Sequence, residues 1–194
     1  MPPRDNAPPP GAPRPRRADA QRNYDLVLAA AKEIFDEQGV SAPLDEIARR
    51  AGVGNATMYR HFPTRTELVI AVYADEVTEL CASGESLLGA KSPGDALFTW
   101  LRAFITHIAT KRELPLTLVD DQQGRRSDLF DGWHHAMHST AAALLARARQ
   151  SADVRADLDV SDVLALAHGA ALTGADAEQI ERLLVLIKSG IEPR

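Results

Sequence analysis

Two short helical patterns that meet at Gly52 constrain the fold of this chain more than any other feature. The first begins near Pro43, because proline suits the first position of a helix, and it ends at the glycine, which suits the position just after a helix. In the second pattern, Met58 and Phe62 stand four residues apart and would anchor one face in a core. Two helices joined by so short a turn are typical of a helix-turn-helix unit.

The second pattern also carries side chains suited to DNA. Within about two helical turns it displays Asn55, Thr57, Tyr59, Arg60 and His61. In a helix-turn-helix, the second helix enters the major groove and its N-terminal residues contact base edges. Asparagine suits adenine, arginine suits guanine and the threonine methyl group suits thymine, whereas a tyrosine hydroxyl suits a phosphate. We therefore expect this segment to bind double-stranded DNA.

The net charge of −5 is unfavourable for DNA binding, but this charge is unevenly distributed along the chain. Residues 1–70 carry ten Lys and Arg against nine Asp and Glu, which gives +1, and the remaining residues carry twelve against eighteen, which gives −6. Affinity for DNA depends on the cations that face phosphates rather than on the net charge of the whole protein. The acidic C-terminal part therefore permits DNA binding but argues against a protein that coats DNA through bulk charge.

Helical periodicity along the rest of the chain predicts an all-α fold. Beyond the two short patterns, we expect helices over residues 18–38, from the Thr64–Glu67 capping box through Leu80, from Ser92 through Ile108, over 114–119, from Ser127 through Leu145, over 160–173 and over 176–189. The pattern weakens between residues 82 and 92. We expect a DNA-binding domain over residues 19–66 and a second helical domain over residues 67–194.

Residues 1–18 hold seven prolines and four arginines, so we expect a disordered arm there. Such an arm is either a solvated tail or an extension that reaches phosphates or the minor groove. Cys81 is the only cysteine, and neither a secretory signal nor a membrane-spanning run is evident, which favours a cytoplasmic protein. Because the chain has no Gly-rich phosphate loop and no nucleophile motif, we expect neither an enzyme nor a cofactor.

Aromatic and histidine side chains gather in the second domain. Both tryptophans and four of the six histidines fall within 39 residues. The residues expected to line a ligand pocket are Trp100, Phe104, His107, Phe130, Trp133, His134, Met137 and His138. Each of them could equally be a core side chain. Such a pocket suits a mainly apolar molecule with one or two polar groups.

A metal-responsive regulator is the alternative, because His134 and His138 have the i, i+4 spacing of a metal-binding pair. A third ligand could come from His107, Asp120 or Asp131, and nothing in the sequence selects among them.

A set of residues at fixed spacing resembles the tetracycline-repressor (TetR) family of bacterial regulators. The matching residues are Phe35, Asp45, Glu46, Ile47, Ala48, Ala51, Gly52, Val53, Thr57, Tyr59, His61, Phe62 and Leu68. The resemblance covers residues 22–72 and implies that DNA is contacted by Gly54, Asn55, Thr57, Tyr59, Arg60, His61 and Arg65. A weaker resemblance to an actinobacterial subgroup lies in residues 155–159.

Three positions depart from the family pattern. Ala42 and Pro43 stand where the family often has threonines that cap the first helix of the motif and touch phosphate. Arg65 replaces the usual lysine, and arginine can still donate to a phosphate. Gly54 takes a place that serine often holds.

The resemblance also implies a homodimer on a near-palindromic operator and a repressor that a small-molecule effector releases from DNA. Residues 160–189 would form the dimer interface, and their small and apolar stripes permit it. The same stripes could instead complete the core of the monomer.

Overall fold

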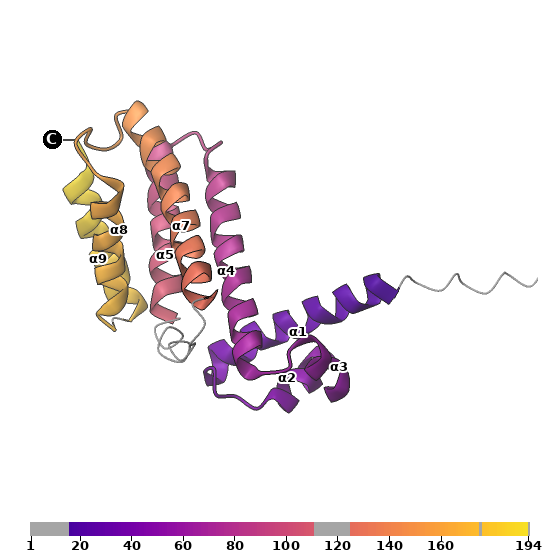
Figure 1. The fold of residues 1–194 in the computed structure, drawn as a ribbon. Coiled ribbons are helices and arrows are strands. Elements are labelled where there is room, and N and C mark those ends of the chain that lie inside the picture. Colours follow the sequence, from indigo (N-terminus) through magenta and orange to yellow (C-terminus); the bar gives the residue numbers. More distant parts are fainter. Residues whose placement is uncertain (1–15, 111–124, 175, 194) are drawn as a thin grey trace, which may run out of the picture. The chain divides into compact units, whose positions relative to one another are not determined.

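The computed structural model describes residues 16–110, 125–174 and 176–193, and these residues form α-helices without a strand (Figure 1). They divide into two compact units, one through Arg65 and one from Thr66. The all-α prediction is confirmed. No helix in the described ranges is both long enough and apolar enough to cross a membrane.

The first unit contains α1 (Arg16–Gln38), α2 (Leu44–Ala51) and α3 (Asn55–His61). Its core is made of apolar side chains from all three helices, among them Val27, Ala31, Ile34, Ile47, Ala48 and Met58. Gly52 ends α2 in the left-handed conformation (φ 68°), which a residue without a Cβ adopts easily, and the chain then turns into α3.

Two boundaries in this unit differ from the sequence prediction. Pro43 is the N-cap of α2 rather than its first helical residue, because its ψ of 132° is extended. Helix α1 begins at Arg16, so the helix already includes the last residues of the expected arm. The remainder of that arm lies outside the described residues.

The second unit contains most of α4 (Arg65–Leu87), together with α5 (Pro93–Thr110), α7 (Arg125–Gln150), α8 (Val160–Leu172) and α9 (Ala177–Ile191). Helix α5 packs against α7, α8 and α9, and α8 and α9 lie side by side (Figure 1). The core of this unit is apolar, and its fully buried side chains include Leu97, Trp100, Leu101, Ile105, Leu144 and Leu145.

Local signals set several helix ends in the second unit. The Ser92 hydroxyl donates to Oδ2 of Asp95 at 2.8 Å, at the predicted start of α5. Asp159 and Asp176 each accept a backbone N–H as the N-caps of α8 and α9. Helix α7 begins at Arg125, two residues before the predicted start. The short helix expected over 114–119 lies outside the described residues.

Helix α4 continues past the point where the sequence pattern fades. It runs to Leu87 and passes through Gly84, where α5 and α7 approach closely. A Cβ built on Gly84 would overlap Cγ2 of Thr140 and would lie 2.9 Å from Cδ1 of Trp100. The glycine that weakens the helical pattern in the sequence is therefore a contact point between three helices.

Candidate functional site

Helix α3 separates a buried anchor from an exposed polar face. Met58 is 0% exposed and Phe62 is 2% exposed, so the predicted anchor of this helix in the core is confirmed. Asn55, Tyr59 and Arg60 are exposed, whereas Thr57 and His61 are half-buried. Gly54 precedes the helix as an extended, exposed N-cap. The side chains predicted to contact DNA thus lie along one short helix whose other face is fixed.

Two of these side chains are held by neighbours within the first unit. Asn55 donates from Nδ2 to Oδ1 of Asp45 at 3.2 Å. The ring of His61 meets that of Tyr24 on α1 edge-on, with 6.1 Å between their centroids. His61 therefore contributes to packing in this unit as well as to the surface of α3.

Arg65 holds the connection between α1 and α2. Its Nη1 donates to the carbonyl oxygens of Val40 at 2.7 Å and of Ala42 at 2.6 Å. This role has no signature in the sequence, because the acceptors are backbone atoms. The predicted contact of Arg65 with a phosphate would have to come from the rest of its guanidinium group. At Pro43, no side chain caps α2, in keeping with the absence of the family's threonine.

The acidic side chains of the first unit pair with arginines of α2 and leave Arg60 of α3 available for binding. Arg50 lies 2.7 Å from Glu37 and 3.8 Å from Glu33, and its hydrogen bond lowers the pKa of Glu37. Arg49 lies 3.8 Å from Glu46. Within the described residues, Arg60 forms neither an ion pair nor a hydrogen bond, so its guanidinium needs no rearrangement before it can bind another group.

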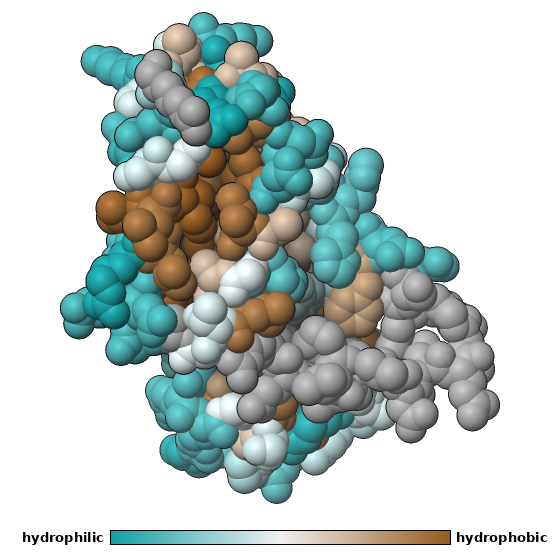
Figure 2. Space-filling model, turned by 90° about the vertical axis from the view of Figure 1, so that its left-hand side faces the viewer, coloured by the Kyte–Doolittle hydropathy of each residue, from teal (hydrophilic) through white to brown (hydrophobic). Residues whose placement is uncertain are grey.

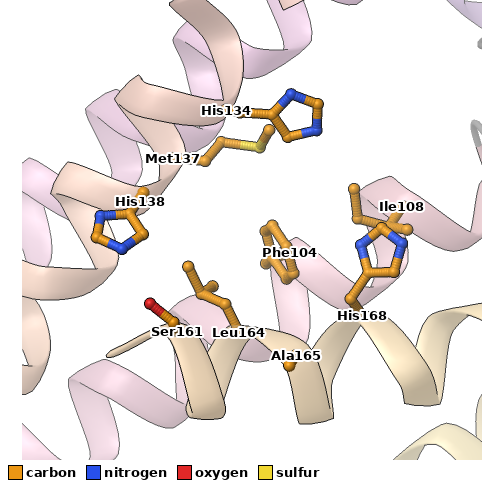
Figure 3. Close-up of a pocket in the computed structure, with 9 residues that line it drawn as sticks. All are labelled: Phe104, Ile108, His134, Met137, His138, Ser161, Leu164, Ala165 and His168. Carbon is orange, nitrogen blue, oxygen red and sulfur yellow. The ribbon is translucent and has the colours of Figure 1, made fainter. Parts of the chain in front are cut away.

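A cavity of about 310 Å³ lies between α5, α7 and α8 (Figure 3). Its lining consists of Phe104, Ile108, His134, Met137, His138, Ser161, Leu164, Ala165 and His168. The structure therefore brings together four of the residues predicted to line a pocket, namely Phe104, His134, Met137 and His138. The wall that α8 supplies was not predicted, because the apolar stripe of this helix was assigned either to a dimer interface or to the core of the monomer. The available signal in the sequence was His168, the single histidine of α8.

The other predicted pocket residues lie elsewhere in the helical unit. Trp100 is fully buried, and its Nε1 donates to the carbonyl of Leu80 at 3.0 Å, which makes it a core residue. Trp133, His107 and Phe130 surround Tyr73, with ring centroids 4.8, 5.0 and 6.2 Å from it. Tyr73 was not singled out in the sequence, because nothing local distinguishes it from other apolar positions of α4.

This aromatic cluster contains a buried acid and base. Oε2 of Glu76 lies 3.7 Å from Nδ1 of His107, and both side chains are largely buried. Burial, with a smaller contribution from the charge of Glu76, raises the pKa of Tyr73 to about 12.

The metal-responsive alternative finds no support in the described ranges. They contain no group of three or more His, Cys, Asp and Glu side chains arranged to hold a metal ion. Nδ1 of His134 lies 2.8 Å from the carbonyl oxygen of Phe130, to which it donates. Asp120, one of the third ligands considered above, lies outside the described residues.

Helices α8 and α9 expose a continuous apolar surface. Leu166 is 54% exposed, Leu172 is 51% exposed and Leu186 is 67% exposed. Figure 2, which views the side where α8 and α9 lie, shows hydrophobic side chains gathered into one patch. Isolated exposed leucines are ordinary, whereas a patch that extends over two adjacent helices is typical of surfaces that bind a partner.

Family models match both units of the chain. Residues 27–72 match the model described as bacterial regulatory proteins, tetR family. Residues 92–193 match the model described as transcriptional regulator SbtR-like, C-terminal domain. The two matches together cover most of the described helices.

Solved structures with the same fold extend the likeness over nearly the whole chain. A TetR transcription regulatory protein from Mycobacterium vanbaalenii is 38% identical, with a TM-score of 0.74, and the match covers 92% of this chain and 100% of that one. The TetR transcriptional regulator SCO0520 from Streptomyces coelicolor is 36% identical, with a TM-score of 0.72, over 87% of this chain and 98% of that one.

Curated relatives match over shorter stretches. The transcriptional regulator AcrR from Shigella flexneri is 37% identical over 100 residues, which is 49% of this chain and 44% of AcrR. The chain thus spans less than half the length of this relative. The two family models and the two full-length structural matches agree, and this chain belongs to the TetR family of bacterial transcriptional regulators.

Proposed function

We propose that this protein is a homodimeric transcriptional repressor that binds a near-palindromic operator and leaves it when a small molecule binds to its helical unit. The observation that carries the proposal is the geometry of α3. Its buried Met58 and Phe62 fix the helix, and its opposite face presents Asn55, Tyr59 and Arg60.

In this proposal the residues of α3 and its flanks make different kinds of contact with DNA. Asn55, Thr57 and Arg60 contact base edges or the phosphates beside them, and Tyr59 donates its hydroxyl to a phosphate. Gly54 allows the backbone to approach DNA, and His61 and Arg65 contribute at the margin of the interface. Arg60 carries the greatest weight, because its guanidinium has no internal partner among the described residues.

The apolar face of α8 and α9 supports dimerisation. One reading helix contacts too few base pairs for tight, specific binding, and two copies related by a two-fold axis read two half-sites. A second copy of the same face would cover Leu166, Leu172 and Leu186, whose exposure in the single chain leaves apolar surface in water.

The cavity between α5, α7 and α8 supports regulation by a small molecule. Helix α8 lines this cavity and also carries part of the apolar face, so a ligand that displaces α8 changes the surface through which two copies meet. Coupling between two sites is typically about 1–3 kcal/mol, or about 5- to 150-fold in affinity. Because the target is a bacterial chromosome, the protein acts in the cytoplasm, and we assign it no enzymatic role.

Selection of a random duplex library on the purified protein tests the DNA-binding proposal. We expect the DNA sequence selected from the library to be two-fold symmetric. Arg60→Ala should weaken binding to that site more than to random DNA, whereas Tyr59→Phe should weaken both to a similar extent. Lys91→Ala is the control, because it also removes one positive charge, at an exposed residue that precedes α5 and lies outside both α3 and the proposed dimer face. Unsymmetric binding, with equal losses for Arg60→Ala on both DNAs, would refute the proposal.

A further inference from the structure

We propose that the cavity between α5, α7 and α8 binds a neutral, mainly apolar molecule that carries a hydroxyl group, such as a phenol. The inference rests on the proposed function, since it names the chemical class of the effector. Four properties of the cavity support it: its apolar interior, its lack of charged lining residues, the fixed tautomer of one histidine and its size.

The interior of the cavity is apolar. Phe104 is 5% exposed and Met137 is 2% exposed, and both side chains point into the cavity together with Leu164 (Figure 3). These side chains offer contact surface to a ring or an aliphatic skeleton and no hydrogen bond. A ligand that fills this space therefore gains mostly from removal of apolar surface from water.

No lysine, arginine, aspartate or glutamate is among the described residues that line the cavity. A charged ligand would lose hydration there without gaining a counter-charge, which is costly in an apolar site. Asp159 lies two residues before the lining residue Ser161, and its carboxylate accepts the backbone N–H of Ser161 at 2.8 Å. This acid opposes an anionic ligand at that end of the cavity.

The polar groups of the lining are three imidazoles and the hydroxyl of Ser161, placed around the apolar interior (Figure 3). The tautomer of His134 is determined by its neighbour, because Nδ1 lies 2.8 Å from the carbonyl oxygen of Phe130, which can only accept. On the neutral ring, Nε2 therefore carries a lone pair and accepts a hydrogen bond. A ligand hydroxyl satisfies this acceptor, and a carboxylate does not.

The volume of about 310 Å³ is at the small end of the range for small-molecule sites. A compound with one or two fused rings suits a space of this size. Naphthol is therefore a suitable probe, with naphthalene as the analogue without a hydroxyl group and naphthoate as the anionic analogue.

Calorimetric titration of the full-length protein with these three probes near neutral pH tests the inference. Naphthol should bind about three- to tenfold more tightly than naphthalene, the gain expected for one net hydrogen bond, and naphthoate should bind more weakly than either. His134→Leu should abolish the preference for naphthol over naphthalene. His135→Leu is the matched control, because His135 is the next residue on α7, is exposed and does not line the cavity.

Ala165→Phe tests the location, because Ala165 lines the cavity from α8 and is exposed enough to accept a larger side chain. This variant should weaken binding of naphthol and naphthalene alike. The inference is overturned if naphthoate binds most tightly, if the folded protein binds none of the probes, or if His134→Leu keeps the preference. It also fails if Ala165→Phe only disrupts the dimer, since the cavity would then hold a second copy of the chain.

Operator binding, measured on the same preparations, separates this inference from the proposed function. If naphthol binds with the expected pattern and leaves operator affinity unchanged, the ligand class stands and release from DNA by the effector is wrong. If the protein binds its operator but none of the probes, DNA binding stands and the ligand class is wrong.

Discussion

Asn55 at the start of α3 donates a hydrogen bond from Nδ2 to Oδ1 of Asp45 in the first turn of α2, over 3.2 Å. A carboxylate can only accept, so the amide nitrogen faces the acid and the amide oxygen is left for another donor. In this orientation Asn55 is suited to the exocyclic amino group of adenine or cytosine. Asp45 thereby determines which half of the asparagine amide is offered to DNA.

Asp45→Ala should lower discrimination at the base pair that Asn55 contacts, by about 0.5–1.5 kcal/mol, the usual net value of one hydrogen bond. Asn55→Ala should affect the same base pair, and the double variant should lose less than the sum of the single losses. Competition binding with operators altered at one base pair at a time measures each loss. Glu46→Ala is the control, because it removes an acid from the same turn of α2 whose contacts are with Arg49 and Gln38. Additive losses at different base pairs would show that the two residues act separately.

The sequence predicted those features of the fold and site that depend on local spacing. The anchor of α3 by Met58 and Phe62 follows from a helical period, and the start of α5 follows from Ser92, Pro93 and Asp95 as a capping sequence. The exposed face of α3 is then determined by exclusion, since one side of the helix is already buried.

Features that depend on packing between distant helices were not predictable in this way. A glycine stands at position 84 inside α4 because α5 and α7 approach there and leave no room for a Cβ. The spacing of apolar residues along α4 alone gives no sign of this approach. Arg65 bonds to backbone carbonyls that any residue would provide. The predicted pocket residues divide between a cavity and the cluster around Tyr73, because the rotation of α5 and α7 about their axes determines which side chains meet.

Gly84→Ala should destabilise the helical unit by about 1–3 kcal/mol, because the added methyl group overlaps Thr140 and presses on Trp100. The higher helix propensity of alanine would offset less than about 1 kcal/mol of this cost. Chemical denaturation measured by circular dichroism gives the difference. Gly132→Ala on α7 is the matched control, since nothing lies within 4 Å of its added Cβ, and it should be neutral or stabilising. Equal stability of the two variants would contradict the close approach of the three helices.

Leu186→Glu should convert the proposed dimer into a monomer, because it places a charge in the apolar face of α8 and α9 that the dimer would bury. Light scattering coupled to gel filtration gives the mass of each species, and circular dichroism shows whether the fold is kept. Leu129→Glu on α7 is the control, since Leu129 is 45% exposed and lies outside α8 and α9. If Leu186→Glu remains dimeric while Leu129→Glu dissociates, the interface lies on another face.

Tyr73 should make the stability of the protein fall between about pH 10 and pH 12, because burial and the nearby Glu76 raise its pKa in the folded state to about 12. An unfolded tyrosine loses its proton near pH 10, so above this pH the unfolded state binds fewer protons than the folded state, and unfolding becomes easier as pH rises. Since Tyr73 is only 5% exposed, its contribution to the loss approaches about 1.4 kcal/mol per pH unit across the window.

Urea unfolding at a series of alkaline pH values compares the protein with Tyr73→Phe, and ultraviolet absorbance of tyrosinate follows the ionisation directly. Tyr73→Phe should show a shallower decline over this window, because phenylalanine has no proton to lose and the other titrating groups are the same in both proteins. Tyr59→Phe, which alters an exposed ring on α3, should keep the steep decline. A decline of equal slope in the parent protein and in Tyr73→Phe would show that Tyr73 ionises as readily in the folded state as in the unfolded state.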